Sequence, residues 1–148
     1  MNKKKIFIAV DTSKISLAKK IIRDTQTNKI KVGYKFGLEF FYSKNGRKFL
    51  SNLKNQTIFL DLKLNDIPNT VRSAVKSLKN LKIAYLTVHL SSGFSALKIL
   101  KKESKNIKIA GVTTLTSLNN KDLKEIGYNK KVNELVRHQA KLATKAKL

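Results

Sequence analysis

One short segment of the chain holds three charged side chains whose spacing could support catalysis. Asp61 and Lys63 lie two residues apart at the end of an apolar run, and Asp66 follows shortly after them. Because side chains alternate between the two faces of a strand, Asp61 and Lys63 are expected on the same face. Charges at the end of a buried strand are costly unless they are paired, so the segment predicts a mutually compensated cluster. The spacing alone fits an ordinary ion pair at the edge of a sheet equally well.

Acidic residues are scarce in this chain, so their positions are informative. Lys and Arg together number 32 against nine Asp and Glu, which gives a formal net charge of +23. Asp11 also ends an apolar run, and Lys31 lies inside another one. With Asp61 and Asp66, three of the five Asp residues fall at the carboxyl ends of predicted strands or in the loops after them. That edge of an α/β sheet is where catalytic sites are built.

Five short runs, mostly of β-branched or aromatic residues, predict the strands that position these side chains. The runs are nearly continuous in apolar residues, which is typical of strands buried on both faces. Their ends lie roughly 22 to 30 residues apart, the spacing of a βα unit. The predicted strands are residues 6–11, 30–34, 57–63, 83–90 and 107–114.

Amphipathic stretches between these runs predict helices around residues 17–22, 40–53, 68–78, 93–100, 122–126 and 131–143. The alternation predicts one α/β domain, residues 1–148, with a parallel sheet, right-handed crossovers and no linker or second domain. The periodicity leaves open whether the strands form an open doubly wound sheet or part of a barrel. The first strand is not followed by a Gly-rich phosphate loop, so a dinucleotide-binding site is not supported.

The segment Asp61-x-Lys63-x-x-Asp66-Ile-Pro-Asn-Thr70 closely resembles the signature of the orotidine 5′-phosphate decarboxylase family. A DxKxxD motif alone is also shared by magnesium-dependent sugar-phosphate decarboxylases and synthases of the same superfamily, which remain the alternative. The resemblance implies a TIM (βα)₈ barrel of which about the first five βα units are present. Four other blocks of the chain also resemble the family and occur in the same order as in its members. They are Ala9-Val10-Asp11, Lys31-Val32-Gly33, Val88-His89 with Ser91 and Gly93, and residues 112–117.

The implied activity is the conversion of orotidine 5′-phosphate to uridine 5′-phosphate and carbon dioxide in pyrimidine biosynthesis, without cofactor or metal. By resemblance, Lys63 would be the general acid that protonates C6 as carbon dioxide leaves. Asp61 would lie against the substrate carboxylate, and Lys31 and Asp66 would complete an alternating Lys–Asp–Lys–Asp array. Decarboxylation builds negative charge at carbon, so preorganised cations suit it. Neighbouring carboxylates favour the ammonium form of Lys63.

Substrate contacts and a partner subunit also follow from the resemblance. Asp11 and Lys31 would hold the ribose hydroxyls, and Thr116 would contact the pyrimidine ring. Asp66 and Thr70 would reach into the site of the partner subunit of a homodimer.

Two residues depart from the family pattern: Asn65 stands where many members carry His, and Ser92 replaces a common Gly. His89 is expected to pack beside the site, and His138 to lie on the surface. A full barrel has about 250 residues, and its phosphate site comes from the loops after strands 7 and 8. We therefore expect this chain to be a fragment that lacks the phosphate-binding Arg and the closing loop.

The strong positive charge also suggests a nucleic-acid-binding module as an alternative. However, the basic residues are 28 Lys and only four Arg, and they are spread over every segment without interleaved aromatic residues. We interpret them as a solvated lysine coat. The chain has no Cys and no run near the ~20 apolar residues of a membrane span, so a cytoplasmic protein is expected.

Overall fold

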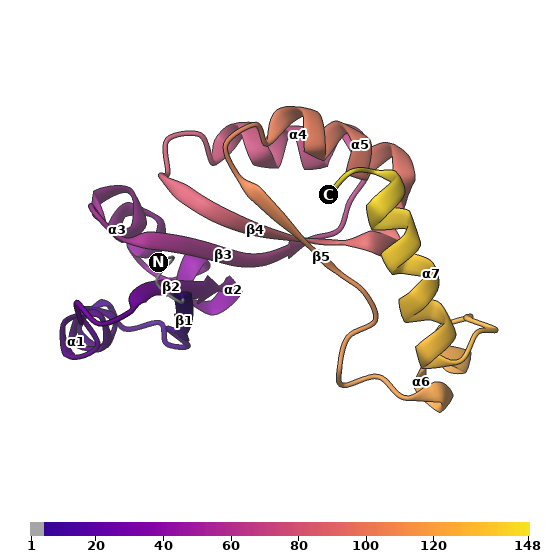
Figure 1. Cartoon of the computed structure of the whole chain (residues 1–148), viewed down its shortest axis with the longest axis horizontal. Helices are drawn as coiled ribbons and strands as arrows, with labels where there is room; N and C mark the ends of the chain where they lie inside the picture. Colours follow the sequence, from indigo (N-terminus) through magenta and orange to yellow (C-terminus); the bar gives the residue numbers. More distant parts are fainter. Residues whose placement is uncertain (1–4) are drawn as a thin grey trace. The chain divides into compact units, whose positions relative to one another are not determined.

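The structure, a computed structural model, describes residues 5–148 and alternates strands with helices as the periodicity predicts (Figure 1). The strands are β1 (Lys5–Ala9), β2 (Lys31–Gly37), β3 (Thr57–Leu64), β4 (Ile83–His89) and β5 (Lys108–Val112). The helices are α1 (Ile15–Asp24), α2 (Leu38–Tyr42), α3 (Gly46–Asn52), α4 (Pro68–Ser77), α5 (Gly93–Glu103), α6 (Asn120–Glu125) and α7 (Val132–Lys145), with a 3₁₀ turn, η1, over Leu90–Ser92.

The strands hydrogen-bond in chain order, β1-β2-β3-β4-β5, within the described residues. The pairs β1–β2 and β2–β3 are parallel. A doubly wound sheet reverses its strand order at a switch point, whereas a barrel does not. The topology therefore resolves the choice that the sequence left open in favour of barrel-type βα units.

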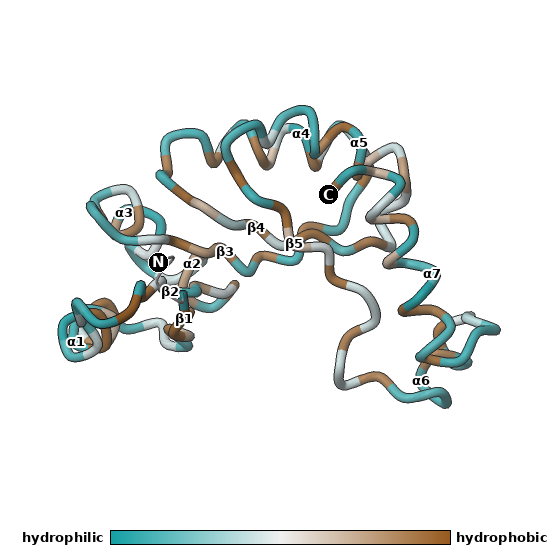
Figure 2. Tube along the Cα trace, viewed as in Figure 1, coloured by the Kyte–Doolittle hydropathy of each residue, from teal (hydrophilic) through white to brown (hydrophobic). Residues whose placement is uncertain are grey.

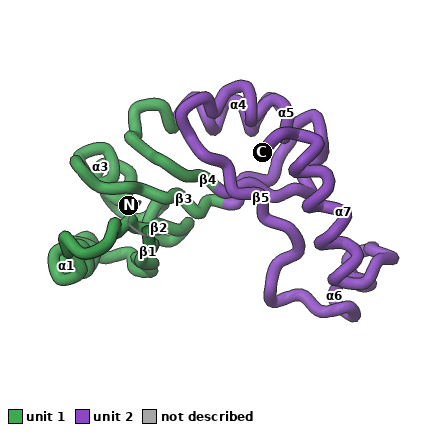
Figure 3. The backbone as a smooth tube through the Cα atoms, in the orientation of Figure 1, with its two compact units in different colours: residues 1–62, 78–86 green, residues 63–77, 87–148 purple. Residues whose placement is uncertain are grey.

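The chain divides into two compact units, coloured separately in Figure 3. Within the described residues, unit 1 comprises residues 5–62 and 78–86, and unit 2 comprises residues 63–77 and 87–148. The boundary between them crosses β3 and β4. The single domain predicted from the sequence stays a prediction, and each unit is described by itself below.

In unit 1, the prediction for the second strand was wrong at its end. The sequence predicts a strand over residues 30–34, whereas β2 continues past Lys35 to Gly37. Tyr34 and Phe36 are fully buried on one face of the strand, so the alternation of side chains places Lys35 on the other face. A charged residue on that second face does not interrupt the strand.

Aromatic side chains pack on both faces of the unit 1 strands. Phe36 contacts Phe40 of α2, with their ring centroids 4.8 Å apart. On the other face, Phe7 stacks edge-on against Phe59 at 5.3 Å and against Tyr85 at 5.1 Å. A Cβ at Gly33 would lie 2.5 Å from the Phe7 ring, so this close packing requires glycine there.

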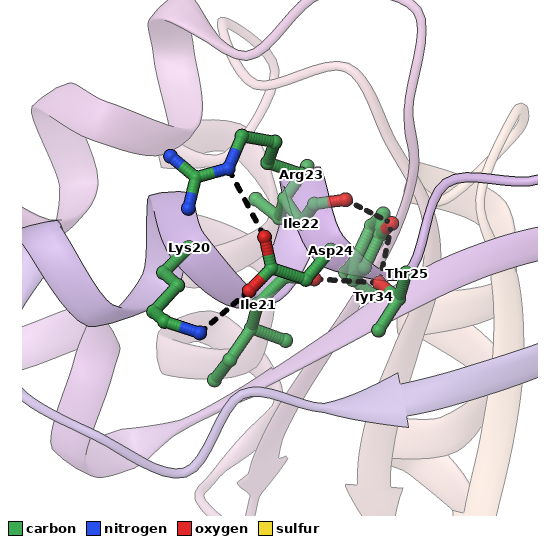
Figure 4. Close-up of polar contacts among 7 residues, drawn as sticks. All are labelled: Lys20, Ile21, Ile22, Arg23, Asp24, Thr25 and Tyr34. Carbon is green, nitrogen blue, oxygen red and sulfur yellow. Dashed lines mark hydrogen bonds and ion pairs between the residues drawn. The ribbon is translucent and has the colours of Figure 1, made fainter.

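Hydrogen bonds connect the end of α1 to β2 (Figure 4). The Tyr34 hydroxyl donates to the Ile22 carbonyl at 3.0 Å. Asp24 accepts from Lys20 at 2.6 Å and from Arg23 at 3.0 Å, and these hydrogen bonds lower the pKa of the Asp24 carboxyl. A carboxylate at a helix C-terminus faces the negative end of the helix dipole, which the two cations offset.

In unit 2, α4 and α5 pack against each other through apolar side chains. In Figure 2, hydrophobic and hydrophilic stretches alternate along α4, α5 and α7, the pattern of helices with one apolar face. Arg72 on α4 lies 3.9 Å from the Glu103 carboxylate on α5. The buried residues of the two helices are Val71, Val75, Ala96, Leu97 and Leu100.

In the part of the chain that the structure describes, no helix has both the length and the apolar character needed to cross a membrane.

Candidate active site

The carboxyl ends of β1, β2 and β3 bring together three charged residues in unit 1. The register pairs Ala9 with Lys35 and Gly37 with Asp61. The backbone N–H of Val10 also donates to the Lys35 carbonyl at 2.9 Å, so Asp11 follows directly beyond the point where β1 meets Lys35. Parallel strands end at one edge of their sheet, and Asp11, Lys35 and Asp61 share that edge.

Lys35 and Asp61 form an ion pair at this edge. The Nζ atom of Lys35 donates to Oδ2 of Asp61 at 3.1 Å. The Asp61 side chain is only 12% exposed and that of Lys35 is 30% exposed. A carboxylate removed from water to this extent needs a cation close by, and Lys35 supplies it from the neighbouring strand. Sequence reasoning predicted the carboxylate and missed this lysine.

Lys31, the predicted member of the array, lies at the opposite end of its strand. It is the first residue of β2, is exposed, and pairs with Lys5 in the register. Lys35 lies four residues further along the strand, about 13 Å away. With Lys5, Gln56 and Thr57 it lines an open polar hollow at the amino-terminal ends of the strands.

The sequence offers two lysines in the same local spacing. The spacing Lys-x-Gly occurs twice in succession, as Lys31-Val32-Gly33 and as Lys35-Phe36-Gly37. The family resemblance rests on the first copy, whereas the structure places Lys35 of the second copy beside Asp61. The shared spacing was thus the available indication of Lys35, and only the length of β2 distinguishes the two copies.

Unit 2 begins at Lys63, whose backbone is left-handed, with φ of 47°. Its N–H donates to Oγ1 of Thr87 on β4 at 2.8 Å. Thr87 is only 5% exposed, so this hydrogen bond is shielded from water. A side chain of β4 therefore accepts a hydrogen bond from the backbone N–H of the residue that the family resemblance implies is the general acid. Sequence reasoning gave Thr87 no role.

The two departures from the family pattern, Asn65 and Ser92, contact each other. Ser92 Oγ donates to Asn65 Oδ1 at 3.0 Å, and Ser91 Oγ approaches the same oxygen at 3.4 Å. These contacts link the loop after β3 to η1 after β4. From the sequence, Asn65 and Ser92 are two unrelated departures from the family pattern. Residues 27 positions apart cannot be predicted to be in contact from their spacing.

The remaining predicted residues lie on exposed loops or at the start of a helix. Oδ1 of Asp66 accepts from the backbone N–H of Ile67 at 2.7 Å, ahead of α4. Thr70 occupies the first turn of α4, and both Asp66 and Thr70 are exposed. Thr116 is exposed in a turn after β5. Unit 2 thus presents Lys63, Asp66 and Thr70 along one continuous segment and Thr116 on a separate loop.

His89 ends β4 and is partly buried. Its removal from water lowers its pKa below the ordinary value, and the charge of Lys63 lowers it further. A neutral imidazole at pH 7 follows from both effects. His89 lines a cavity of about 280 Å³ with Asn65, Ser91 and Thr113, and apolar side chains such as Leu123 also line it. His138, in contrast, is exposed on α7.

Comparisons with known proteins give a consistent result. The family model described as "Orotidine 5'-phosphate decarboxylase / HUMPS family" matches residues 4–148. The orotidine 5′-phosphate decarboxylase of Carboxydothermus hydrogenoformans is 35% identical, over 97% of this chain and 63% of that relative. The protein of that name from Wolbachia sp. subsp. Brugia malayi is 42% identical, over 97% of this chain and 64% of its own length.

The crystal structure of orotidine 5′-phosphate decarboxylase from Lactobacillus acidophilus superposes with a TM-score of 0.88 at 30% identity. The match covers 97% of this chain and 68% of that structure. The chain therefore spans a little under two thirds of the length of the two curated relatives.

Proposed function

Because the chain belongs to the orotidine 5′-phosphate decarboxylase / HUMPS family, we propose that it carries most of the catalytic charges of an orotidine 5′-phosphate decarboxylase. The reaction would convert orotidine 5′-phosphate to uridine 5′-phosphate and carbon dioxide during pyrimidine (UMP) biosynthesis. The observation that carries the proposal is the ion pair between Lys35, near the carboxyl end of β2, and Asp61, near that of β3. Strand β3 also contains Lys63.

In the proposed mechanism, Asp61 lies against the substrate carboxylate. Two negative groups held close together raise the energy of the bound substrate relative to the transition state, in which the carboxylate departs as neutral carbon dioxide. The bonding electron pair stays on C6 of the pyrimidine. The ammonium group of Lys63 delivers its proton to that carbon, which leaves Lys63 as the neutral amine.

We assign to Lys35 the role that the sequence gave to Lys31. Its ammonium group is hydrogen-bonded to the Asp61 carboxylate, and a preorganised cation of this kind stabilises negative charge as it develops. Lys35 would also hold a ribose hydroxyl together with Asp11, which follows β1 at the same edge. The proposed array is then Lys35, Asp61, Lys63 and Asp66.

The pyrimidine contact of Thr116 and the homodimer also belong to the proposal. Asp66 and Thr70 are exposed, as side chains that complete a partner's site must be before the subunits meet. Ile67 between them is 66% exposed, which gives such a contact an apolar component. We further propose a cytoplasmic location, with which the absence of cysteine is compatible.

A magnesium-dependent sugar-phosphate enzyme of the same superfamily is the alternative. The curated relatives at 35% and 42% identity are both named orotidine 5′-phosphate decarboxylases, which favours the decarboxylase. Addition of excess EDTA distinguishes the two activities. The proposed reaction uses only side chains, so its rate should be unchanged, whereas a magnesium-dependent reaction should stop.

The test is a chimera in which residues 1–148 replace the matching part of the Lactobacillus acidophilus decarboxylase. Formation of uridine 5′-phosphate from orotidine 5′-phosphate should be restored in the chimera, and Lys63→Ala should lower the rate by at least ~100-fold. The 148-residue chain alone should turn over far more slowly, because phosphate contacts supply binding energy that is used at the reacting carbon. A folded chimera without turnover would refute the proposal.

A further inference from the structure

Lys63 adopts a backbone conformation that its own Cβ disfavours. Its φ of 47° lies in the left-handed region, which residues other than glycine, asparagine and aspartate seldom occupy. Such a residue persists only where its surroundings hold it, and residues of this kind cluster at functional sites. Contacts with neighbouring residues must therefore hold the backbone of Lys63 in this conformation.

The hydroxyl of Thr87 is the contact that the geometry identifies. It accepts the Lys63 N–H at 2.8 Å, and Thr87 is 5% exposed, so water is poorly placed to replace it. An N–H without an acceptor at such a place would carry the full cost of its desolvation. Valine has the same shape as threonine and favours strands equally, so the hydroxyl is what distinguishes Thr87 from an ordinary β4 residue.

A second link holds the same segment. Ser92 donates to Asn65 at 3.0 Å, two residues after Lys63. The end of β3 is thus tied to the end of β4 and the turn after it by side-chain hydrogen bonds on either side of Leu64. Of the two acceptors, only Thr87 Oγ1 is buried and bonded to the backbone of Lys63 itself.

We propose that Thr87 is a positioning residue: its hydroxyl fixes the left-handed backbone of Lys63 and thereby the direction from which the Lys63 ammonium is delivered. This inference rests on the proposed function for its catalytic meaning, but its structural content is independent of it. Thr87 acts through the backbone of Lys63 and takes no part in proton transfer.

Three variants of this chain test the structural content by NMR. Thr87→Val removes the acceptor at constant shape, Thr87→Ser keeps it, and Thr25→Val removes a hydroxyl of unit 1 as the matched control. A left-handed residue gives a strong HN–Hα cross-peak within itself. That cross-peak of Lys63 should persist in the Ser and control variants and weaken in Thr87→Val. The Lys63 amide should also exchange faster by ~10-fold or more relative to Leu60 in Thr87→Val.

An unchanged Lys63 cross-peak and unchanged amide protection in Thr87→Val would overturn the proposal. If Thr87→Val does not fold, the double variant Thr87→Val with Lys63→Gly decides the question, since glycine carries no Cβ to strain the segment. Recovery of the fold in the double variant supports the proposal, and failure to recover contradicts it.

Kinetics of the same substitutions in the chimera separate positioning from general stability. Misdirection of a catalytic group costs up to ~100-fold in rate, so kcat should fall in Thr87→Val while KM stays nearly constant. Thr87→Ser should restore most of kcat. A rise in KM alone would contradict positioning. Absence of turnover in every variant, with the NMR result as expected, would refute the proposed function and leave the positioning of Lys63 standing.

Discussion

Lys63 combines the proposed chemistry with a strained backbone. The left-handed conformation costs a residue with a Cβ about 1–2 kcal/mol, and the chain accepts this at the residue proposed to donate the proton. Stability given up at a functional position is a common trade-off, because the geometry needed for catalysis differs from the one that is most stable.

Replacement of Lys63 by glycine should therefore release part of the strain. We expect Lys63→Gly to be more stable than Lys63→Ala by about 0.5–1 kcal/mol. Glycine removes the strain of the Cβ in the left-handed conformation, and the larger backbone entropy that glycine loses on folding offsets part of that gain. Urea unfolding of the two variants measures the difference. In an unstrained strand the order would reverse, and Lys63→Gly would be the less stable variant.

His89 should make the stability of the chain depend on pH. Burial and Lys63 lower the pKa of His89 in the folded state, whereas the unfolded state titrates near 6.5. Above that value both states are neutral at this residue. As the pH falls below about 6.5, His89 binds a proton in the unfolded state before it does so in the folded state. The free energy of unfolding therefore decreases as the pH falls from about 6.5 to the lower pKa of the folded state.

The measurement is urea unfolding of His89→Gln at about pH 7.5 and about pH 5. The variant should lose less stability over this range than the unsubstituted chain. His138→Gln, at the exposed histidine of α7, should retain the original pH dependence. An identical loss in the His89→Gln variant would show that His89 is not held neutral by the fold.

At the scale of elements, the loop after β3 is held to η1 by residues that the family pattern treats as exceptions. Ser92 Oγ donates to Asn65 Oδ1 at 3.0 Å, so the departure at position 65 has a partner at position 92. Lys63 precedes this contact and Asp66 follows it, which gives the contact a role in holding the proposed catalytic segment.

A double-mutant cycle measures the Asn65–Ser92 contact. We expect Asn65→Ala and Ser92→Ala each to destabilise the chain and their effects to couple by about 0.5–1 kcal/mol, the net value of a partly exposed hydrogen bond. Ser51→Ala, on α3 of unit 1, should be additive with Asn65→Ala. Additivity of the Asn65 and Ser92 substitutions would contradict the contact.

The elements themselves could largely be predicted, because apolar runs and amphipathic stretches mark their existence directly. The end of β2 could not, since Lys35 interrupts the apolar run although it occupies the less buried face of the strand. Lys31 was proposed from the Lys31-Val32-Gly33 spacing, which Lys35-Phe36-Gly37 shares. The conformation of Lys63 was also beyond prediction, because strict alternation assumes an extended backbone at every residue of β3.

At the scale of the whole molecule, the proposed charges are distributed over both compact units. Asp11, Lys35 and Asp61 lie in unit 1, whereas Lys63 and Asp66 lie in unit 2. The chain covers 63% and 64% of the two curated relatives, and the proposed activity concerns a protein of their length. Family membership follows from the match over residues 4–148, and the proposed role of Lys35 rests on its ion pair with Asp61.

The most direct test of this account compares Lys35→Met with Lys31→Met in the Lactobacillus acidophilus chimera, with decarboxylation of orotidine 5′-phosphate as the readout. Lys35→Met should lower kcat/KM by ~100-fold or more, since it removes the preorganised cation that Lys35 places 3.1 Å from the Asp61 carboxylate. Lys31→Met, at the exposed start of β2, should leave the rate within about threefold, as expected of a surface substitution. Loss of activity in Lys31→Met with retention in Lys35→Met would contradict the account.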